Sequence, residues 1–370
     1  MEPNDNKRLL SLDVFRGLTM ALMVTVNNCG GLPEGSALTH AAWNGCTPTD
    51  LVFPFFLFIV GIAITFSLTK RKEAGENVYR KILIRTAWIV GIGIFLNGAP
   101  QFNLASWRIP GVLTRIGIVY GITAFLFMKF SPRQLVYIGI GCLLGYWALE
   151  TLIPVPGQGY ASLEEGKDLG AWLDRLIFPN HLYRWTSQPD APHPAYDPES
   201  ILGTMSALGT CIGGVLAGLW LRKKQDALPR WTGLFAVGFL LMVGGLLWGE
   251  AFPINKKLWT SSYVLYHSGL ALLSLSTVWW IVDFKGKNGW TAPFVWLGMN
   301  PLAIYICHEV MAIVMGSIPI GDSNLYDWVR DTLFGWTGHN MSVFLNALLH
   351  VAVNTLVAWV LYKKKIFIRV

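Results

Sequence analysis

The chain has 370 residues, of which 53% are hydrophobic and only 14% are charged, and its formal net charge is +7. This composition excludes an ordinary soluble domain and is typical of a protein that crosses a membrane several times. The positive charge follows from membrane topology, as shown below, so we expect no nucleic-acid partner.

The apolar segments predict an all-α, polytopic membrane protein with about ten transmembrane helices. A helix needs about 20 mostly apolar residues to span a bilayer, and these segments do not show the alternation of β-barrel strands. The first segment carries Asp13 and Arg16 and has no small-residue cleavage site, so we interpret it as a retained helix rather than a signal peptide. The ten segments are roughly 9–29, 48–69, 81–98, 111–129, 133–153, 200–221, 230–250, 258–282, 292–316 and 342–362.

Lysine and arginine concentrate on alternate sides of these segments. With the N-terminus inside, inner segments hold 19 of these residues and outer segments hold 7. Because cytoplasmic loops are enriched in lysine and arginine, both termini are predicted to be cytoplasmic. We expect one transmembrane domain over residues 1–370, with outer loops at about 154–199 and 317–341. Aromatic residues recur at helical spacing in both loops, so both are predicted to be ordered.

Ionisable and amide side chains lie within several predicted spans, where they are costly and indicate function. Asp13 and Arg16 are three residues apart on one helix face, so they can also simply neutralise each other. Arg115 has no acidic partner in its own helix. Asn300 and His308 share a segment that Pro301 breaks, and such a break frees a backbone carbonyl that can line a cavity.

The stretch "LTHAAWNGCTPTDLVFPFF" (38–56) brings polar groups to the outer end of the second span. A short glycine-containing loop connects it to Asn27, at the outer end of the first span, and can bring Asn27 toward His40. An imidazole can accept a proton from an attacking amine or attack an acyl carbon itself. A carboxamide can donate to a developing oxyanion. We therefore predict His40 and Asn27 as catalytic residues, with Asp50 orienting the imidazole.

The five cysteines show no metal-ligand spacing, and no metal site is expected. Cys29 and Cys46 both fall near the outer face, so they either form a disulfide or remain as two unpaired small residues.

Seven blocks of sequence resemble the heparan-α-glucosaminide N-acetyltransferase family, in the family's order and over about residues 8–370. They are "LDVFRGLTMALMVTVNN", "HAAWNGCTPTDLVFPFFLFIVG", "RIPGVLTRIGIVY", "YDPESILGTMSALGTCIGGVLAG", "FPINKKLWTSSYV", "LGMNPLAIYICHEV" and "LYKKKIFI". The lysosomal members carry a luminal N-terminal domain that these blocks do not include. We therefore expect a bacterial-type homologue in the inner membrane.

The resemblance implies that acetyl passes from cytosolic acetyl-CoA to the amine of a terminal glucosamine across the membrane. It places the catalytic histidine at His40 and its partner at Asn27, and it implies a homodimer. An anionic CoA needs a protein-lined route, for which Arg16, Arg115, Asn300 and His308 are the predicted donor-binding residues. Whether His40 is acetylated or acts as a base in direct transfer stays open, as does the acceptor: free glucosamine, another amino sugar or an envelope glycan.

Two alternatives remain open at this stage. Ten helices with intramembrane charges and a proline-broken segment also suit a secondary transporter for a sugar or organic anion. Against it, no inverted repeat is visible, and the polar groups gather toward the outer face rather than the midplane. An O-acetyltransferase that acts on an envelope polysaccharide is the other alternative.

Overall fold

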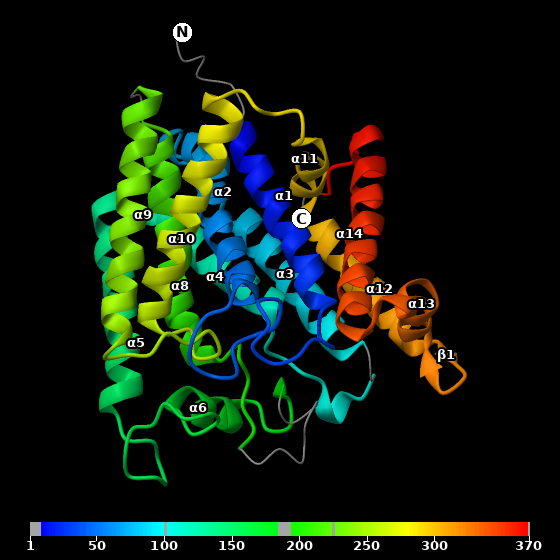
Figure 1. Ribbon diagram of the computed structural model, residues 1–370. Helices are drawn as coiled ribbons and strands as arrows, with labels where there is room; N and C mark the ends of the chain where they lie inside the picture. The colour runs from blue at the N-terminus through cyan, green and yellow to red at the C-terminus, as the bar shows by residue number, and fades with distance from the viewer. Residues whose placement is uncertain (1–8, 100–101, 184–193, 224–225, 369–370) are drawn as a thin grey trace. The chain divides into compact units, whose positions relative to one another are not determined.

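The computed structural model in Figure 1 describes residues 9–99, 102–183, 194–223 and 226–368. The chain divides into two compact units, one formed by residues 1–40 and 271–369 and the other by residues 41–270. We call these the split unit and the central unit. The predicted single domain over 1–370 stays a prediction, and each unit is described by itself.

The predicted polytopic, all-α architecture is confirmed. Within the described residues, nine helices are long and apolar enough to cross a membrane, and a bent pair of helices raises the number to ten if it counts as one span. Their bounds agree closely with the ten predicted segments. The third span, which looked short in the sequence, is a helix of 20 residues.

The central unit is a bundle of helices around a close crossing of α2 and α8. A Cβ atom on Gly61 would lie 2.1 Å from the carbonyl oxygen of Cys211, and one on Gly214 would lie 2.0 Å from that of Phe58. Glycine at both positions therefore lets the two backbones touch, as is common where membrane helices pack. The elements are η1 (Pro48–Leu51), α2 (Val52–Glu73), α3 (Tyr79–Gly98), η2 (Leu104–Ser106), α4 (Val112–Lys129), α5 (Pro132–Leu152), α6 (Leu169–Ile177), α8 (Ile201–Leu221), α9 (Ala227–Gly249) and the first half of α10 (Ser261–Trp279).

The split unit joins the first helix to the last third of the chain. A Cβ atom on Gly17 of α1 would lie 1.7 Å from the carbonyl oxygen of Phe294 in α11, so these two helices also pack backbone to backbone. Figure 1 shows α13 beside the first turns of α14. The elements are α1 (Leu10–Asn27), the end of α10, η3 (Trp280–Phe284), α11 (Ala292–Met299), α12 (Pro301–Ser317), β1 (Pro319–Ile320), β2 (Ser323–Asn324), α13 (Leu325–Phe334), η4 (Gly335–Thr337) and α14 (His339–Lys363).

Large apolar side chains cover the outsides of several helices. Leu240 and Leu247 of α9 are 68% and 70% exposed, and Leu83 of α3 is 67% exposed. Water would disfavour such a surface, whereas lipid tails solvate it. The chain is therefore a multi-pass membrane protein.

The predicted break at Pro301 is present, and it is sharper than a kink. α11 and α12 meet at 87° across Asn300. Proline cannot donate the hydrogen bond that would continue α11. The Gly298 carbonyl, at the end of α11, accepts a hydrogen bond of 3.1 Å from the Arg16 guanidinium.

Both predicted outer loops contain ordered elements. The first holds α6, and the second holds the β1–β2 hairpin and α13. The expected order is thus confirmed, except that residues 184–193 of the first loop lie outside the described residues. The hairpin was not predicted, because each of its strands has only two residues.

Candidate functional site

Asn27, the predicted partner of the catalytic histidine, ends α1 and lies in the wall of a cavity of about 310 Å³ within the split unit. The side chain is exposed. Residues from α13 and α14 complete the wall, chiefly Tyr326, Asp327, Arg330 and Val343. The structure therefore places the predicted amide where a small polar molecule can approach it.

Two hydrogen bonds attach the loop after α1 to the far end of the chain. The Tyr326 hydroxyl donates to the carbonyl oxygen of Asn28 over 3.2 Å, and the His339 imidazole lies 2.9 Å from that of Gly31. Asn28 itself is buried, and its amide donates to the carbonyl oxygen of Val24 over 2.7 Å. Both asparagines line the cavity, but the Asn28 amide is engaged at the helix end, whereas the Asn27 side chain is exposed.

The cavity wall carries one cation between two carboxylates. The Arg330 guanidinium contacts Asp327 at 2.7 Å and Asp331 at 2.7 Å. The hydrogen bond with Asp331 raises the pKa of Arg330 and lowers that of Asp331. Of these three residues, Asp327 and Arg330 line the cavity, so its wall offers a ligand one carboxylate and one guanidinium side by side.

His40 lies on the exposed connection between the two units. The residue after it is fixed, because the Ala41 N–H donates to the Asp50 carboxylate over 3.1 Å. The same oxygen of Asp50 accepts from the Thr47 N–H over 3.0 Å and from the Thr47 hydroxyl over 3.1 Å. Asp50 thus holds the backbone that follows His40, and its predicted role in orienting the imidazole stays a prediction.

The loop that follows His40 packs on the start of α10, over 200 residues later in the sequence. The Gly45 N–H donates to the carbonyl oxygen of Ile254 over 2.7 Å, and the Asn255 amide donates to the Asn44 side chain over 3.1 Å. The Lys257 ammonium donates to the carbonyl oxygen of Ala42 over 2.6 Å. Two blocks that were singled out separately in the sequence therefore form one structure.

Lys256 and Asn255 were not predicted as part of this site. The Lys256 ammonium lies 3.7 Å from Asp50, and Asn255 is fully buried. Burial lowers the pKa of Lys256, and Asp50 opposes this change. The sequence signal that could have identified them is the polar run "NKK" (255–257), shortly before a predicted span. Two lysines on a predicted outer loop are not explained by the positive-inside rule.

Cys29 and Cys46 are both free thiols in the structure. Burial raises the pKa of Cys46 to about 12, and the charge of Asp50 adds to this effect. A thiol with so high a pKa is a poor nucleophile at neutral pH. Cys46 is therefore a weak candidate for a nucleophile in this loop, and the role predicted for His40 stays a prediction.

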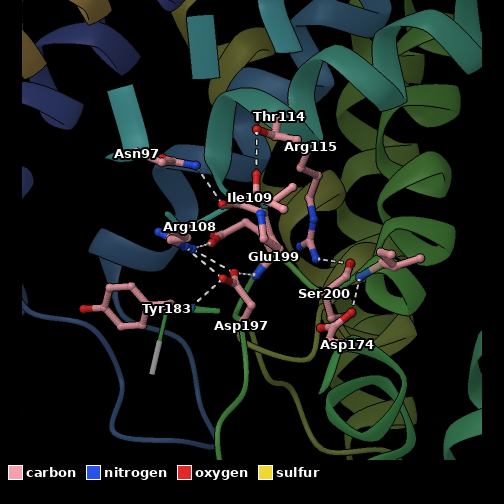
Figure 2. Close-up of polar contacts among 12 residues, drawn as sticks. Asn97, Arg108, Ile109, Thr114, Arg115, Asp174, Tyr183, Asp197, Glu199 and Ser200 are labelled. Atoms are coloured by element: carbon pink, nitrogen blue, oxygen red, sulfur yellow. Dashed lines mark hydrogen bonds and ion pairs between the residues drawn. The ribbon is translucent and has the colours of Figure 1, made fainter. Parts of the chain in front are cut away.

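An ion-pair cluster fastens the acidic outer loop to the start of α4 (Figure 2). Arg108 contacts both oxygens of Asp197 at 2.9 and 2.8 Å, and it also contacts Glu199 at 2.5 Å. The ring of Tyr183 lies against the guanidinium at 4.7 Å. Burial opposes the charges, but their mutual attraction is stronger, so the pKa of Asp197 lies below its usual value.

Arg115, a predicted donor-binding residue, lies one turn into α4 and is 1% exposed (Figure 2). It donates to the carbonyl oxygen of Ser200 over 2.9 Å, and its guanidinium lies 5.1 Å from the Trp259 ring. Its Nε and Nη1 atoms have no hydrogen-bond partner among the described residues. Part of Arg115 therefore supports α8, and part remains available to an anion.

The other three predicted donor-binding residues belong to the split unit. Arg16 lies 3.6 Å from Asp13, as the spacing suggested, and holds the end of α11. Both ends of the Asn300 amide make hydrogen bonds. Its nitrogen donates to the carbonyl oxygen of Ile366, and its oxygen accepts from the N–H of Ile368, over 2.9 Å each. His308 is 2% exposed, and its Nδ1 has no partner within the described residues. Arg16 and Asn300 thus hold the helix break and the C-terminal segment together.

No group of three histidine, cysteine, aspartate or glutamate side chains able to hold a metal ion occurs in the described part of the chain.

Residues 8–161 match the model of a family described as heparan-alpha-glucosaminide N-acetyltransferase, catalytic. Over 97% of its length the chain is 34% identical to human heparan-alpha-glucosaminide N-acetyltransferase, and it is 34% identical to the mouse protein over the same share. The chain spans 59% of the human relative and 60% of the mouse relative. The resemblance found in the sequence motifs is confirmed.

Proposed function

We propose, from the premise that the chain belongs to the heparan-α-glucosaminide N-acetyltransferase family, that it transfers acetyl from acetyl-CoA to the amine of a glucosamine-type sugar. The observation that carries the proposal is the place of Asn27 in a polar cavity wall. Asp327 in the same wall gives an amine a carboxylate to approach. Because the chain spans less than two thirds of its named relatives, activity, acceptor and partners are all part of the proposal.

His40 is proposed to handle the proton of the acceptor amine. In direct transfer, the amine nitrogen attacks the thioester carbon, His40 accepts the amine proton, and the carbon–sulfur bond breaks to release CoA thiolate. In the two-step route, a ring nitrogen of His40 attacks the thioester carbon and CoA thiolate leaves. The amine then attacks the acetyl carbon, and the imidazole leaves and takes up the amine proton. Asn27 donates to the oxyanion in either route, and Asp50 fixes the backbone beside His40.

The donor is proposed to enter from the cytoplasm, with its thioester reaching the outer side. Two N–H groups of Arg115 and the Nδ1 atom of His308 are unpartnered among the described residues, so they fit an anionic or polar ligand. Arg16 and Asn300 fit less well, because the hydrogen bonds described above occupy their side chains. We therefore rank Arg115 and His308 first among the four predicted donor residues.

The membrane is proposed to be a bacterial inner membrane, with both termini cytoplasmic and the protein assembled as a homodimer. The Asp327 carboxylate in the cavity wall favours an amine acceptor over a neutral polysaccharide hydroxyl. Offering glucosamine and a hydroxyl-only sugar side by side distinguishes the two: an N-acetyltransferase acetylates only the amine.

The central test compares His40→Ala and Asn27→Ala with the wild type in acetyl transfer to glucosamine. We expect losses of about two to four orders of magnitude for His40→Ala and about two to three for Asn27→Ala. Acetyl-CoA should still raise the Tm of both variants. Asn103→Ala is the matched control, because this asparagine is exposed and only caps a turn.

Near-normal transfer in either variant removes that residue from the mechanism. Absence of any acetyl-CoA-dependent stabilisation in the wild type refutes the acetyltransferase proposal and favours a sugar carrier instead.

A further inference from the structure

One face of α14 is polar, although the helix crosses the membrane. Asn346, His350 and Asn354 follow one another at four-residue spacing and are 1%, 2% and 0% exposed. Four-residue spacing places side chains on one side of a helix. On the remaining surface, Leu348 and Leu356 are exposed. We call these three buried residues the α14 stripe.

The α14 stripe has more hydrogen-bonding groups than partners. Within the described residues, neither the Nδ1 of His350 nor the Oδ1 of Asn354 has a hydrogen-bond partner, whereas the Asn346 amide interacts with the Tyr326 hydroxyl. The Nδ1 of His308, on the neighbouring α12, is also unpartnered. Buried polar groups are nearly always satisfied by protein, water or ligand, and leaving them unpaired costs free energy. An unpaired row in a membrane helix therefore points to a ligand.

The α14 stripe begins at the cavity that contains Asn27. Val343, one turn before Asn346 and Ala347, lies in the cavity wall together with Tyr326. The Tyr326 ring packs on the His350 ring with centroids 5.1 Å apart. The row of polar groups thus continues from the proposed site of transfer along the helix into the membrane.

We propose that the α14 stripe binds the pantetheine arm of acetyl-CoA, an inference that rests on the proposed function. The arm is uncharged and carries two amide groups, each with a donor and an acceptor. Amide and imidazole side chains supply the matching acceptors and donors without a buried charge. From Asn346 to Asn354 the helix rises about 12 Å, and each four-residue step is about 6 Å. The row is therefore long enough to follow much of the extended arm.

The same geometry sets the direction in which the pantetheine arm lies along α14. The thioester end of the arm lies toward the cavity and Asn27, and the pantoyl end lies toward Asn354. Asn354 should therefore sense only donors long enough to reach it, whereas the short thioester S-acetyl-N-acetylcysteamine should not depend on it.

The experiment measures KM for acetyl-CoA and for S-acetyl-N-acetylcysteamine in the wild type and in Asn354→Leu, which keeps the shape of the side chain. We expect KM for acetyl-CoA to rise about tenfold, as for a lost hydrogen bond, and KM for the short donor to stay unchanged. Without donor, the Tm should stay close to that of the wild type, because the change removes the unpaired Oδ1 together with the hydrogen bond from the Asn354 amide to the His350 carbonyl oxygen. Thr355→Val is the control, since the Thr355 hydroxyl is already bonded to the Val351 carbonyl at 2.7 Å.

Equal KM changes for both donors, or none for either, overturn the inference while the wild-type activity upholds the proposed function. A fall in the donor-free Tm with a uniform loss of activity assigns the α14 stripe to structure, and this also overturns the inference. A wild type that neither uses nor is stabilised by acetyl-CoA refutes the proposed function itself. If Asn354→Leu does not accumulate in the membrane, Asn346→Leu serves in its place. For this variant we expect a smaller difference between the KM change for acetyl-CoA and the KM change for the short donor.

Discussion

Replacing Arg108 by methionine should destabilise the central unit strongly. Asp197 is fully buried at its side chain and Glu199 is 8% exposed, so the change leaves two carboxylates without their shared cation. Removing one partner of a buried ion pair costs about 3–5 kcal/mol. Since 1 kcal/mol shifts Tm by about 2–4 °C in domains of this size, Tm should fall by roughly 6–20 °C.

The assay is thermal unfolding of the detergent-purified protein, followed at several pH values. Arg108→Lys keeps the positive charge but loses the bidentate hydrogen bonds to Asp197. Its Tm should therefore lie between those of the methionine variant and the wild type. Asp197 has a folded pKa below its unfolded value, so its stabilisation is present above about pH 4 and is lost as pH falls through the folded pKa. The difference between variant and wild type should therefore shrink in acid. A methionine variant that melts within 2 °C of the wild type, roughly 1 kcal/mol or less, would refute this reasoning.

Three further predictions concern other parts of the fold. Burial raises the pKa of Asp174 to about 7, so its contribution to stability is greatest below about pH 4 and is lost as pH rises through 7. Asp174→Asn should melt above the wild type at pH 8 and converge with it only below about pH 4. Asp50→Ala frees the backbone beside His40, so kcat should fall about a hundredfold while acetyl-CoA still raises Tm; unchanged kcat would contradict this role. Gly17→Ala forces a Cβ against the Phe294 carbonyl and should cost about 1–3 kcal/mol by thermal unfolding, whereas Gly91→Ala, where the added atom meets nothing within 4 Å, should not.

Hydropathy predicted the spans well because each helix must be apolar along its own length, a property local to the sequence. The break at Pro301 was predictable for the same reason. The 87° angle was not, because it depends on Arg16, nearly 300 residues away, holding the end of α11.

The sequence predicted one part of the candidate site, around Asn27 and His40, and missed the residues that come from the far end of the chain. Asn27 and His40 lie 13 positions apart in short blocks beside a span, and such a cluster can be recognised. The partners of Asn27 in the cavity, Tyr326 and Arg330, come from the other end of the chain. The strand-like pairing of Gly45 with Asn255 likewise joins distant segments. Such contacts follow from tertiary packing and leave no local pattern.

The right angle between α11 and α12 has a consequence for the bilayer around it. Two helices at 87° cannot both follow the membrane normal, so at least one of them must be strongly tilted. Backbone at that depth must be shielded from lipid tails by protein or water. The break at Asn300 meets this requirement with protein, because Asn300 is 1% exposed and its side chain is bonded to the backbone of Ile366 and Ile368.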